Sequence, residues 1–291
     1  MRQSNNSFVA HPGTRAGCPE CRGRGLVVGR EGPLARAELC SCVGTCPRCQ
    51  GTGFVGDPRD RRAPRRRCVC RVANARIELF NRAHIPARHA GSTRTSFDGK
   101  KKGPAVPFLA VANYLKDYQP GSENRGLVLY GRVGRGKTHL MVAVLRELIL
   151  DHGVSARFVE FSHLIADLKS SFDRGSGAAA LLDPLSSVDV LAIDELGKGR
   201  VTEWETTVLD ELISRRYNAA ATILATTNWE PRAATGQAVP SLARPDDAPA
   251  LVDRVGPRIY SRLEETCDFV PCLGDDYRSH LRRHRRPGRV R

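Results

Sequence analysis

The stretch that most restricts the fold of this chain runs from residue 125 to residue 150, RGLVLYGRVGRGKTHLMVAVLRELIL. It reads as an apolar strand, a glycine-rich loop and an amphipathic helix, in that order. The loop GRVGRGKT completes the pattern of a phosphate-binding loop, whose glycines permit a tight curve of backbone amides. We expect Lys137 to reach the β- and γ-phosphates of ATP and the Thr138 hydroxyl to bind Mg²⁺. The predicted nucleotide-binding residues are consecutive: Gly131, Arg132, Val133, Gly134, Arg135, Gly136, Lys137, Thr138 and His139.

Two acidic residues end a second apolar stretch. VDVLAIDELG, residues 188–197, reads as a buried parallel strand that ends in Asp194 and Glu195. Parallel strands bring their carboxyl ends to the edge of the sheet where nucleotides bind. After a complete phosphate-binding loop, we predict that Asp194 holds Mg²⁺ through water and that Glu195 polarises the attacking water. Without that loop, the same pattern is more often a strand that meets solvent.

A third strand, TILATTN over residues 222–228, ends in polar residues that can reach between the two motifs. Asn228 is the candidate for positioning water against the γ-phosphate, and its alternative role is to cap the turn into Trp229. Further strands over 156–162 and 267–273, with helices between them, predict an α/β fold with five parallel strands in a doubly wound sheet. The extra strand between the loop and the acidic pair distinguishes this pattern from kinase-like folds.

Eight of the ten cysteines form an internal repeat with a period of 28 residues. Each copy reads Cys-x2-Cys-x18-Cys-x-Cys, and the copies open alike with CPECRGRG and CPRCQGTG, which indicates a duplication. Two such cysteine pairs closed by a hairpin give a tetrahedral thiolate cage that suits zinc. We predict one zinc ion in each copy, held by Cys18, Cys21, Cys40 and Cys42 and by Cys46, Cys49, Cys68 and Cys70.

Three alternatives compete with this assignment. Disulfides are one, but neither a signal peptide nor a membrane span is apparent, so we expect a cytoplasmic, reducing location without membrane association. An iron–sulfur cluster is the second. The third is an interleaved pairing of residues 18 and 21 with residues 68 and 70. Cys267 and Cys272 lie in an apolar stretch and read as ordinary buried cysteines.

Positive charge gathers at the two ends of the chain. Residues 1–104 hold 21 Lys and Arg against 7 Asp and Glu, and residues 278–291 add seven arginines. Six arginines lie between residues 56 and 67. Because eight thiolates and two zinc ions sum to about −4, the N-terminal region stays basic after metal binding. Such clusters indicate a polyanion partner, DNA or RNA, and the alternative is a solubilising surface with a disordered tail.

Over residues 75–278 the chain resembles the bacterial replicative helicase loaders of the DnaC and DnaI group and the IstB-type transposition helper ATPases. The likeness rests on the nucleotide motifs, IELFNRAHIPARHAGSTRTSF, ELISRRYN and DRVGPRIYSRLEETCDFVPCLGDDYR. It implies an AAA+ P-loop ATPase with a minimal lid. We expect a flexible N-terminus over 1–17, a duplicated cysteine module over 18–70, a helical linker over 71–104, the ATPase domain over 105–277 and a basic tail over 278–291.

In those families the segment GPRIYSRL supplies arginines that complete the nucleotide site of a neighbouring subunit. The resemblance therefore implies such a role for Arg258 and Arg262 in a homo-oligomer, and an exposed basic helix face is the alternative. It also suggests that Arg215 and Arg216 face DNA or a neighbouring subunit. The alternative is that they lie at a solvated helix end. The CxxCxGxG segments resemble the zinc region of DnaJ-type chaperones, which implies a structural or protein-binding module.

Three functions fit these observations. The first is an ATP-dependent loader that assembles on single-stranded DNA and delivers a hexameric replicative helicase, with the cysteine module as partner-binding arm. The second is a transposition helper that binds duplex DNA and recruits a transposase. The third is a zinc-dependent adaptor whose nucleotide site only switches its shape, and the presence of both Asp194 and Glu195 argues against it. The duplicated cysteine module departs from the loaders' pattern, so the partner protein stays open.

Overall fold

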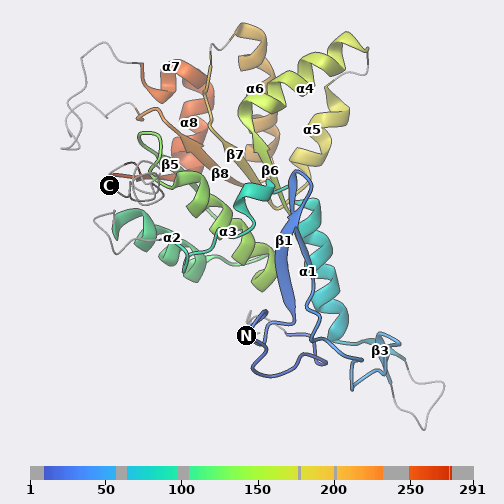
Figure 1. The fold of residues 1–291 in the computed structure, drawn as a ribbon. Helices are drawn as coiled ribbons and strands as arrows, with labels where there is room; N and C mark the ends of the chain where they lie inside the picture. The colour runs from blue at the N-terminus through green and yellow to red at the C-terminus, as the bar shows by residue number, and fades with distance from the viewer. Residues whose placement is uncertain are drawn as a thin grey trace, which may run out of the picture. The chain divides into compact units, whose positions relative to one another are not determined.

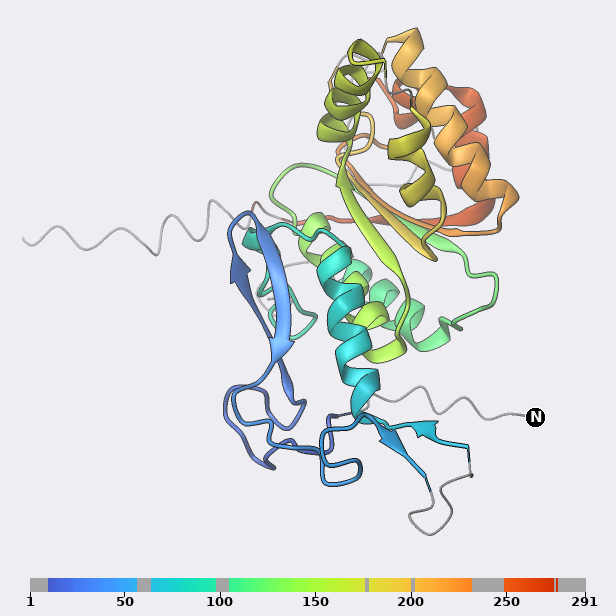
Figure 2. The same cartoon turned by 90° about the vertical axis from the view of Figure 1, so that its right-hand side faces the viewer.

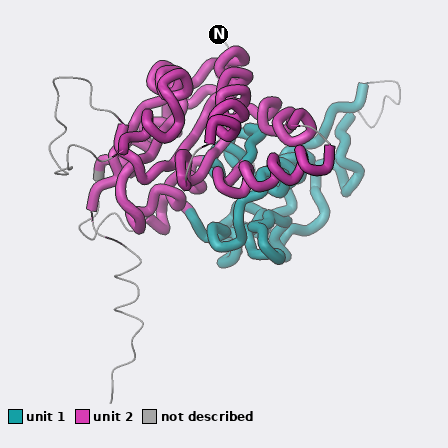
Figure 3. Tube along the Cα trace, turned by 90° about the horizontal axis from the view of Figure 1, so that it is seen from above, with its two compact units in different colours: residues 1–92, 145–157 teal, residues 93–144, 158–291 magenta. Residues whose placement is uncertain are grey.

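The computed structural model describes residues 10–56, 64–97, 105–175, 178–199, 202–231, 249–274 and 276. The chain forms two compact units (Figure 3). Unit 1 comprises residues 1–92 and 145–157, and unit 2 comprises residues 93–144 and 158–291. The domain boundaries expected from the sequence stay predictions, and the predicted C-terminal tail lies outside the described residues. None of the described helices is long and apolar enough to cross a membrane.

Unit 1 contains two antiparallel hairpins followed by a helix. Strands β1 (Leu26–Glu31) and β2 (Leu34–Leu39) form the first hairpin, and β3 (Phe54–Val55) and β4 (Arg66–Arg67) form the second. Helix α1 (Cys70–Arg82) follows, and then the short 3-10 helix η1 (Ala87–His89). The β1–β2 ribbon runs alongside α1 (Figures 1 and 2).

Polar contacts attach α1 to its neighbours within unit 1. The Asn81 side chain accepts a hydrogen bond from the Ala37 amide at 2.8 Å and donates one to the Ala37 carbonyl at 3.0 Å. Arg76, which is buried, donates to the Leu150 carbonyl at 3.0 Å. That carbonyl belongs to the last turn of a helix, where unpaired acceptors favour a cation. The first hairpin and α1 are therefore tied by side chains as well as by packing.

Unit 2 is built on the predicted five-stranded sheet, in the order β6-β7-β8-β5-β9. The strands are β5 (Gly126–Tyr130), β6 (Ala156–Glu160), β7 (Val190–Asp194), β8 (Thr222–Thr227) and β9 (Cys267–Pro271). The sheet is parallel, and β5, β7 and β8 are buried along their whole length. Since β8 lies between β5 and β7, the extra central strand predicted to set this fold apart from kinase-like folds is present.

Helices cover both faces of this sheet (Figure 1). One face packs against α4 (Phe161–Asp173), α5 (Ala179–Ser186), α6 (Glu203–Asn218), α7 (Leu251–Val255) and α8 (Pro257–Thr266). The other carries α2 (Ala105–Asp117) and the first half of α3 (Lys137–His152). The doubly wound α/β architecture expected from the sequence is confirmed.

Arg216 is a structural residue in this core, which contradicts the suggestion that it faces DNA or a neighbour. Its side chain is fully buried. Burial lowers the pKa of its guanidinium to about 10. It donates hydrogen bonds to the carbonyls of Leu185, Ser186, Val188, Asp189 and Thr222. The neighbouring Arg215 is half-exposed and forms ion pairs with Asp183 and Glu211.

Candidate nucleotide site and metal centres

The predicted phosphate-binding loop connects β5 to the first residue of α3, at the carboxyl edge of the sheet. Two glycines are required by its geometry. Gly131 has a φ of 133°, and a Cβ there would lie 2.6 Å from the Cys272 carbonyl oxygen. Gly134 has a φ of 84°, and a Cβ would overlap the Asp276 carboxylate. The curve of the loop therefore depends on residues without a side chain, as the sequence pattern indicated.

Lys137 is buried within the curve of this loop. Its ammonium group donates to the carbonyls of Gly131 at 2.7 Å and Arg132 at 2.9 Å, and to the Asn228 side-chain oxygen at 2.9 Å. Burial lowers the pKa of this group to about 8. Asn228 follows β8 directly, so the structure brings the predicted sensor side chain to the predicted phosphate-binding lysine.

Asp194 accepts hydrogen bonds from two threonines. The Thr138 hydroxyl donates to Asp194 Oδ1 at 2.9 Å, and the Thr226 hydroxyl donates to the same oxygen at 2.5 Å. Burial raises the pKa of this carboxyl group. Thr226 belongs to β8, the neighbour of β7, and its hydroxyl also accepts from the Glu195 amide at 3.0 Å. Sequence reasoning did not single out Thr226, although strand adjacency places it there.

Glu195 turns away from the strand direction, with a φ of 57° that non-glycine residues rarely adopt. Its carboxylate forms an ion pair with Lys198. Lys198 also lies 3.6 Å from the carboxylate of Glu160, at the end of β6. The hydrogen bond to Glu195 raises the pKa of Lys198. Sequence reasoning missed this triad, because a lysine three residues after an acidic pair carries no signal of its own.

A segment before α2 contacts the start of α3. The His139 Nε2 lies 2.9 Å from the Thr93 carbonyl and 3.2 Å from the Ser96 hydroxyl. The Phe97 and His139 rings are 5.8 Å apart, and a Cβ on Gly136 would lie 2.7 Å from the Phe97 ring. This segment belongs to the edge of the site and was assigned only to a linker by sequence reasoning.

The two predicted finger arginines lie on α8 and share one acidic neighbour. Arg262 donates to Asp210 at 2.6 Å and lies over the Tyr217 ring at 5.8 Å. Arg258 lies 3.9 Å from Asp210, and its side chain is 77% exposed. Within one chain the described contacts therefore join both arginines to Asp210 on α6, away from the cluster around Lys137.

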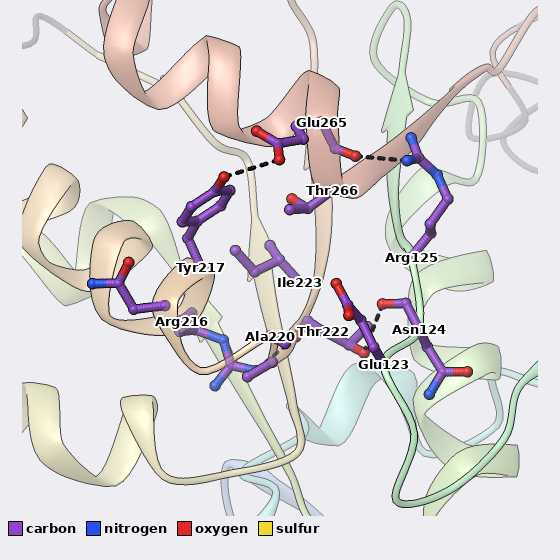
Figure 4. Close-up of a pocket in the computed structure, with 12 residues that line it drawn as sticks. Glu123, Asn124, Arg125, Arg216, Tyr217, Ala220, Thr222, Ile223, Glu265 and Thr266 are labelled. Atoms are coloured by element: carbon purple, nitrogen blue, oxygen red, sulfur yellow. Dashed lines mark hydrogen bonds between the residues drawn. The ribbon is translucent and has the colours of Figure 1, made fainter.

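A cavity of about 620 Å³ opens near the first residues of β5 and β8, the ends opposite to the phosphate-binding loop (Figure 4). Tyr217 donates to the Glu265 carboxylate at 2.9 Å, and Arg125 donates to the Glu265 carbonyl at 2.6 Å. Because Tyr217 and Arg125 pair with Glu265 across its wall, we assign no ligand to this cavity.

The cysteines gather within each repeat, and this favours the in-repeat pairing over the interleaved one. In each group of four, the sulfur atoms all lie within 4.8 Å of one another. Individual S–S distances are 3.8 Å for Cys18–Cys40 and 3.5 Å for Cys49–Cys70. A tetrahedral site with Zn–S bonds of about 2.3 Å requires sulfurs about 3.8 Å apart, so both groups fit zinc.

A backbone amide also supports the second group. The Gly53 amide donates to the Cys49 sulfur at 3.3 Å, which stabilises a thiolate. All ten cysteines are free thiols, so the disulfide alternative finds no support. Cys267 and Cys272 are buried away from both groups, as expected.

Comparison with known proteins gives this site a family. The family model described as "IstB-like ATP binding protein" matches residues 109–285, more than half of the chain. The chain belongs to the family of IstB-like ATP-binding proteins. Its unit 2 is thus an AAA+ nucleotide-binding domain of the IstB and DnaC type, as the sequence resemblance implied.

Among curated proteins, the replicative helicase loader DnaC of Escherichia coli K12 is 26% identical over 141 residues, which are 48% of this chain and 56% of DnaC. The phage-like element PBSX protein XkdC of Bacillus subtilis is 25% identical over 211 residues, 70% of this chain and 68% of XkdC. The chain spans about half the length of the first of these relatives. A crystal structure of the DnaC helicase loader superposes with a TM-score of 0.52 and 25% identity, covering 64% of this chain and 99% of that one.

Proposed function

We propose that this IstB-like protein hydrolyses ATP in a Mg²⁺-dependent reaction at the carboxyl edge of β5, β7 and β8. The observation that carries the proposal is one hydrogen-bonded cluster in which Lys137 meets Asn228 and Thr138 meets Asp194. These side chains come from the loop after β5, the end of β7 and the end of β8. Three separate parts of the sequence thus converge on the place where a triphosphate would lie.

Each residue has a defined task in this proposal. A triphosphate offers the Lys137 ammonium charged acceptors in place of two loop carbonyls, which are its present partners. Thr138 and Asp194 would hold Mg²⁺, which would neutralise phosphate charge. Glu195 polarises the attacking water, and Asn228 orients that water against the γ-phosphate. The amides of the glycine-rich loop fix the phosphates at the start of α3.

Two substitutions test these roles separately. Lys137→Ala should abolish ATP binding, because it removes the buried cation of the loop. Glu195→Gln should keep ATP binding and slow hydrolysis by about 10² to 10⁴, the usual contribution of general base catalysis. Lys116→Ala, an exposed lysine on α2, is the matched control and should behave as the parent. Equal ATP affinity of the parent and Lys137→Ala would contradict the assignment.

We propose that the ATPase acts as a helicase loader that assembles on single-stranded DNA and delivers a hexameric replicative helicase. The support is the likeness to the DnaC helicase loader in sequence and in fold. In this proposal Arg258 of one subunit completes the nucleotide site of the next, and the support is that its side chain is 77% exposed. The two cysteine groups hold one Zn²⁺ each and shape the arm that binds the helicase.

A transposition helper that binds duplex DNA is the second candidate, favoured by the IstB-like family match. DNA binding with ATP and with ADP, compared at one ionic strength, separates the two, because phosphate contacts weaken steeply with salt. A loader should prefer single strands in ATP and capture the replicative helicase. It should lose the helicase, but not ATP, when residues 1–70 are removed. Preference for duplex DNA and capture of a transposase would support the helper function.

A further inference from the structure

The two cysteine repeats have the same metal cage but different surroundings. Over residues 18–42 the first repeat holds four arginines and three glutamates. Over residues 46–70 the second repeat holds seven arginines and two aspartates. Positions 28 residues apart correspond. Glu20, Ala37, Glu38 and Leu39 of the first repeat correspond to Arg48, Arg65, Arg66 and Arg67 of the second, and Leu26 corresponds to Phe54. In the other direction, Arg22, Arg24 and Arg36 correspond to Gln50, Thr52 and Pro64.

Charge compensation for the metal site does not explain this difference. A zinc ion with four thiolates carries about −2 in either repeat. The first repeat folds around that charge with a nearly balanced set of side chains, so its cage does not require the excess of arginine. The additional positive charge of the second repeat must therefore act on something outside the cage.

The two hairpins also differ in how much of their surface is packed. The first hairpin runs along α1, and its Ala35 and Ala37 are buried. The second hairpin, β3–β4, extends beyond the first turn of α1 (Figures 1 and 2). Arg65, Arg66 and Arg67 are all exposed on it. The second repeat therefore has an exposed, basic hairpin where the first repeat has a packed one.

An aromatic side chain accompanies these arginines. Phe54 is 41% exposed, whereas its counterpart Leu26 is 4% exposed. Phe54 pairs across the hairpin with Arg67, and the Arg71 guanidinium lies 4.7 Å from the centre of its ring. An exposed ring flanked by planar guanidinium groups is a surface on which nucleobases stack, while the arginines bind the phosphates between them.

We propose that strands β3 and β4 of the second cysteine repeat bind single-stranded nucleic acid, with Phe54 stacking on a base and Arg66 and Arg67 binding phosphates. A single strand is favoured because stacking on Phe54 needs an unpaired base. This rests on the proposed function and deepens it, because it gives assembly on single-stranded DNA a site in the cysteine module, which ATP hydrolysis and helicase delivery do not require.

The test uses full-length protein, without nucleotide, and a fluorescent oligothymidine whose anisotropy reports binding. Phe54→Leu gives the second repeat the residue of the first and should weaken binding about tenfold, within the range for one lost stacking contact. Phe54→Trp should retain binding. Arg66→Ala with Arg67→Ala should reduce the slope of log affinity against log salt by about 1.4, because each phosphate contact on a single strand contributes about 0.7.

Arg15→Ala with Arg30→Ala removes the same charge from exposed positions outside the second repeat and is the matched control. It should leave the affinity within twofold. Zinc content and ATP binding equal to those of the parent would show that each variant is folded. Unchanged affinity in both Phe54→Leu and the Arg66/Arg67 variant would overturn the proposal. An equal loss of affinity in the control would also overturn it. So would a higher affinity for duplex DNA than for the single strand that Phe54→Leu does not change.

Discussion

Different forces stabilise the nucleotide-binding unit and the cysteine repeats. The core of unit 2 is a continuous apolar cluster from the sheet and five helices, including Leu168, Leu191 and Leu212. The clusters in the two repeats consist mainly of cysteines, with a few valines against them. Burial of apolar surface can therefore form the nucleotide site before any ligand binds, whereas the repeats have too little of it. The folding of the repeats must depend on the metal.

Metal removal should give the largest difference in stability between the two regions. A chelator should abolish amide protection from hydrogen exchange in both repeats and leave β5, β7 and β8 protected. Structural zinc supplies about 10 to 16 kcal/mol to a small module, more than the repeats can replace. Elemental analysis of fresh protein should find two zinc ions per chain.

Single cysteine substitutions provide the control. Cys40→Ser should release one zinc ion, because Cys40 belongs to the first group, whereas Cys272→Ala, outside both groups, should retain two. Fewer than two metal ions in fresh protein, or equal loss of protection in the repeats and the sheet, would remove the distinction between the two regions.

The finger arginine tests whether the nucleotide site, formed within one chain, needs a second chain to act. Arg258→Ala should leave ATP binding unchanged and lower the hydrolysis rate of the assembled protein by about 10³ to 10⁵. Mixing Arg258→Ala with Lys137→Ala subunits should restore part of the activity. The Lys137→Ala subunit supplies Arg258 to the intact nucleotide site of the Arg258→Ala subunit. Arg262→Ala is the comparison, since its ion pair with Asp210 predicts a loss of stability instead. No recovery on mixing would mean that Arg258 does not act in trans.

Much of this organisation could be predicted from local patterns. The phosphate-binding loop, the acidic pair and the cysteine repeat each occupy a short stretch in which spacing alone fixes the geometry. Adjacent parallel strands then bring Asp194 and Asn228 near the loop, because buried strands of this type end at one edge. The in-repeat grouping of cysteines was predicted from the spacing that the two copies share.

Contacts between distant segments could not be predicted in this way. Thr226 reaches Asp194 only because β8 and β7 pair in one register, and Lys198 reaches Glu160 only because a third strand ends beside them. Arg216 looked like a surface residue because it follows another arginine near a helix end. Its burial depends on five carbonyls from the end of α5, the segment before β7 and the start of β8, which no spacing in the sequence reveals.

Arg216 provides a way to weaken the nucleotide-binding unit without touching the repeats. Arg216→Met keeps the apolar stem but leaves buried carbonyls without a donor, and each unsatisfied group costs about 1 to 3 kcal/mol. We expect at least about 3 kcal/mol less stability in urea unfolding followed by a probe in unit 2, with zinc content unchanged. Arg215→Met removes a half-exposed, ion-paired arginine and should cost under about 1 kcal/mol. Equal effects of the two substitutions would show that the buried contacts do not stabilise unit 2.

The smallest expected effect concerns Lys198. Its ammonium group pairs with the carboxylate of Glu195, which we propose as the general base. Its ion pair with Glu195 is partly exposed, with 50% of the Lys198 side chain accessible. Exposed pairs contribute about 0.2 to 1 kcal/mol, so Lys198→Ala should raise the basal hydrolysis rate by no more than about fivefold, at unchanged ATP affinity. Lys198→Arg should keep the parent rate, because it retains the charge. A fall in rate at unchanged affinity would instead mean that Lys198 holds Glu195 in its working position, and that part of the catalytic arrangement lies outside the motifs visible in the sequence.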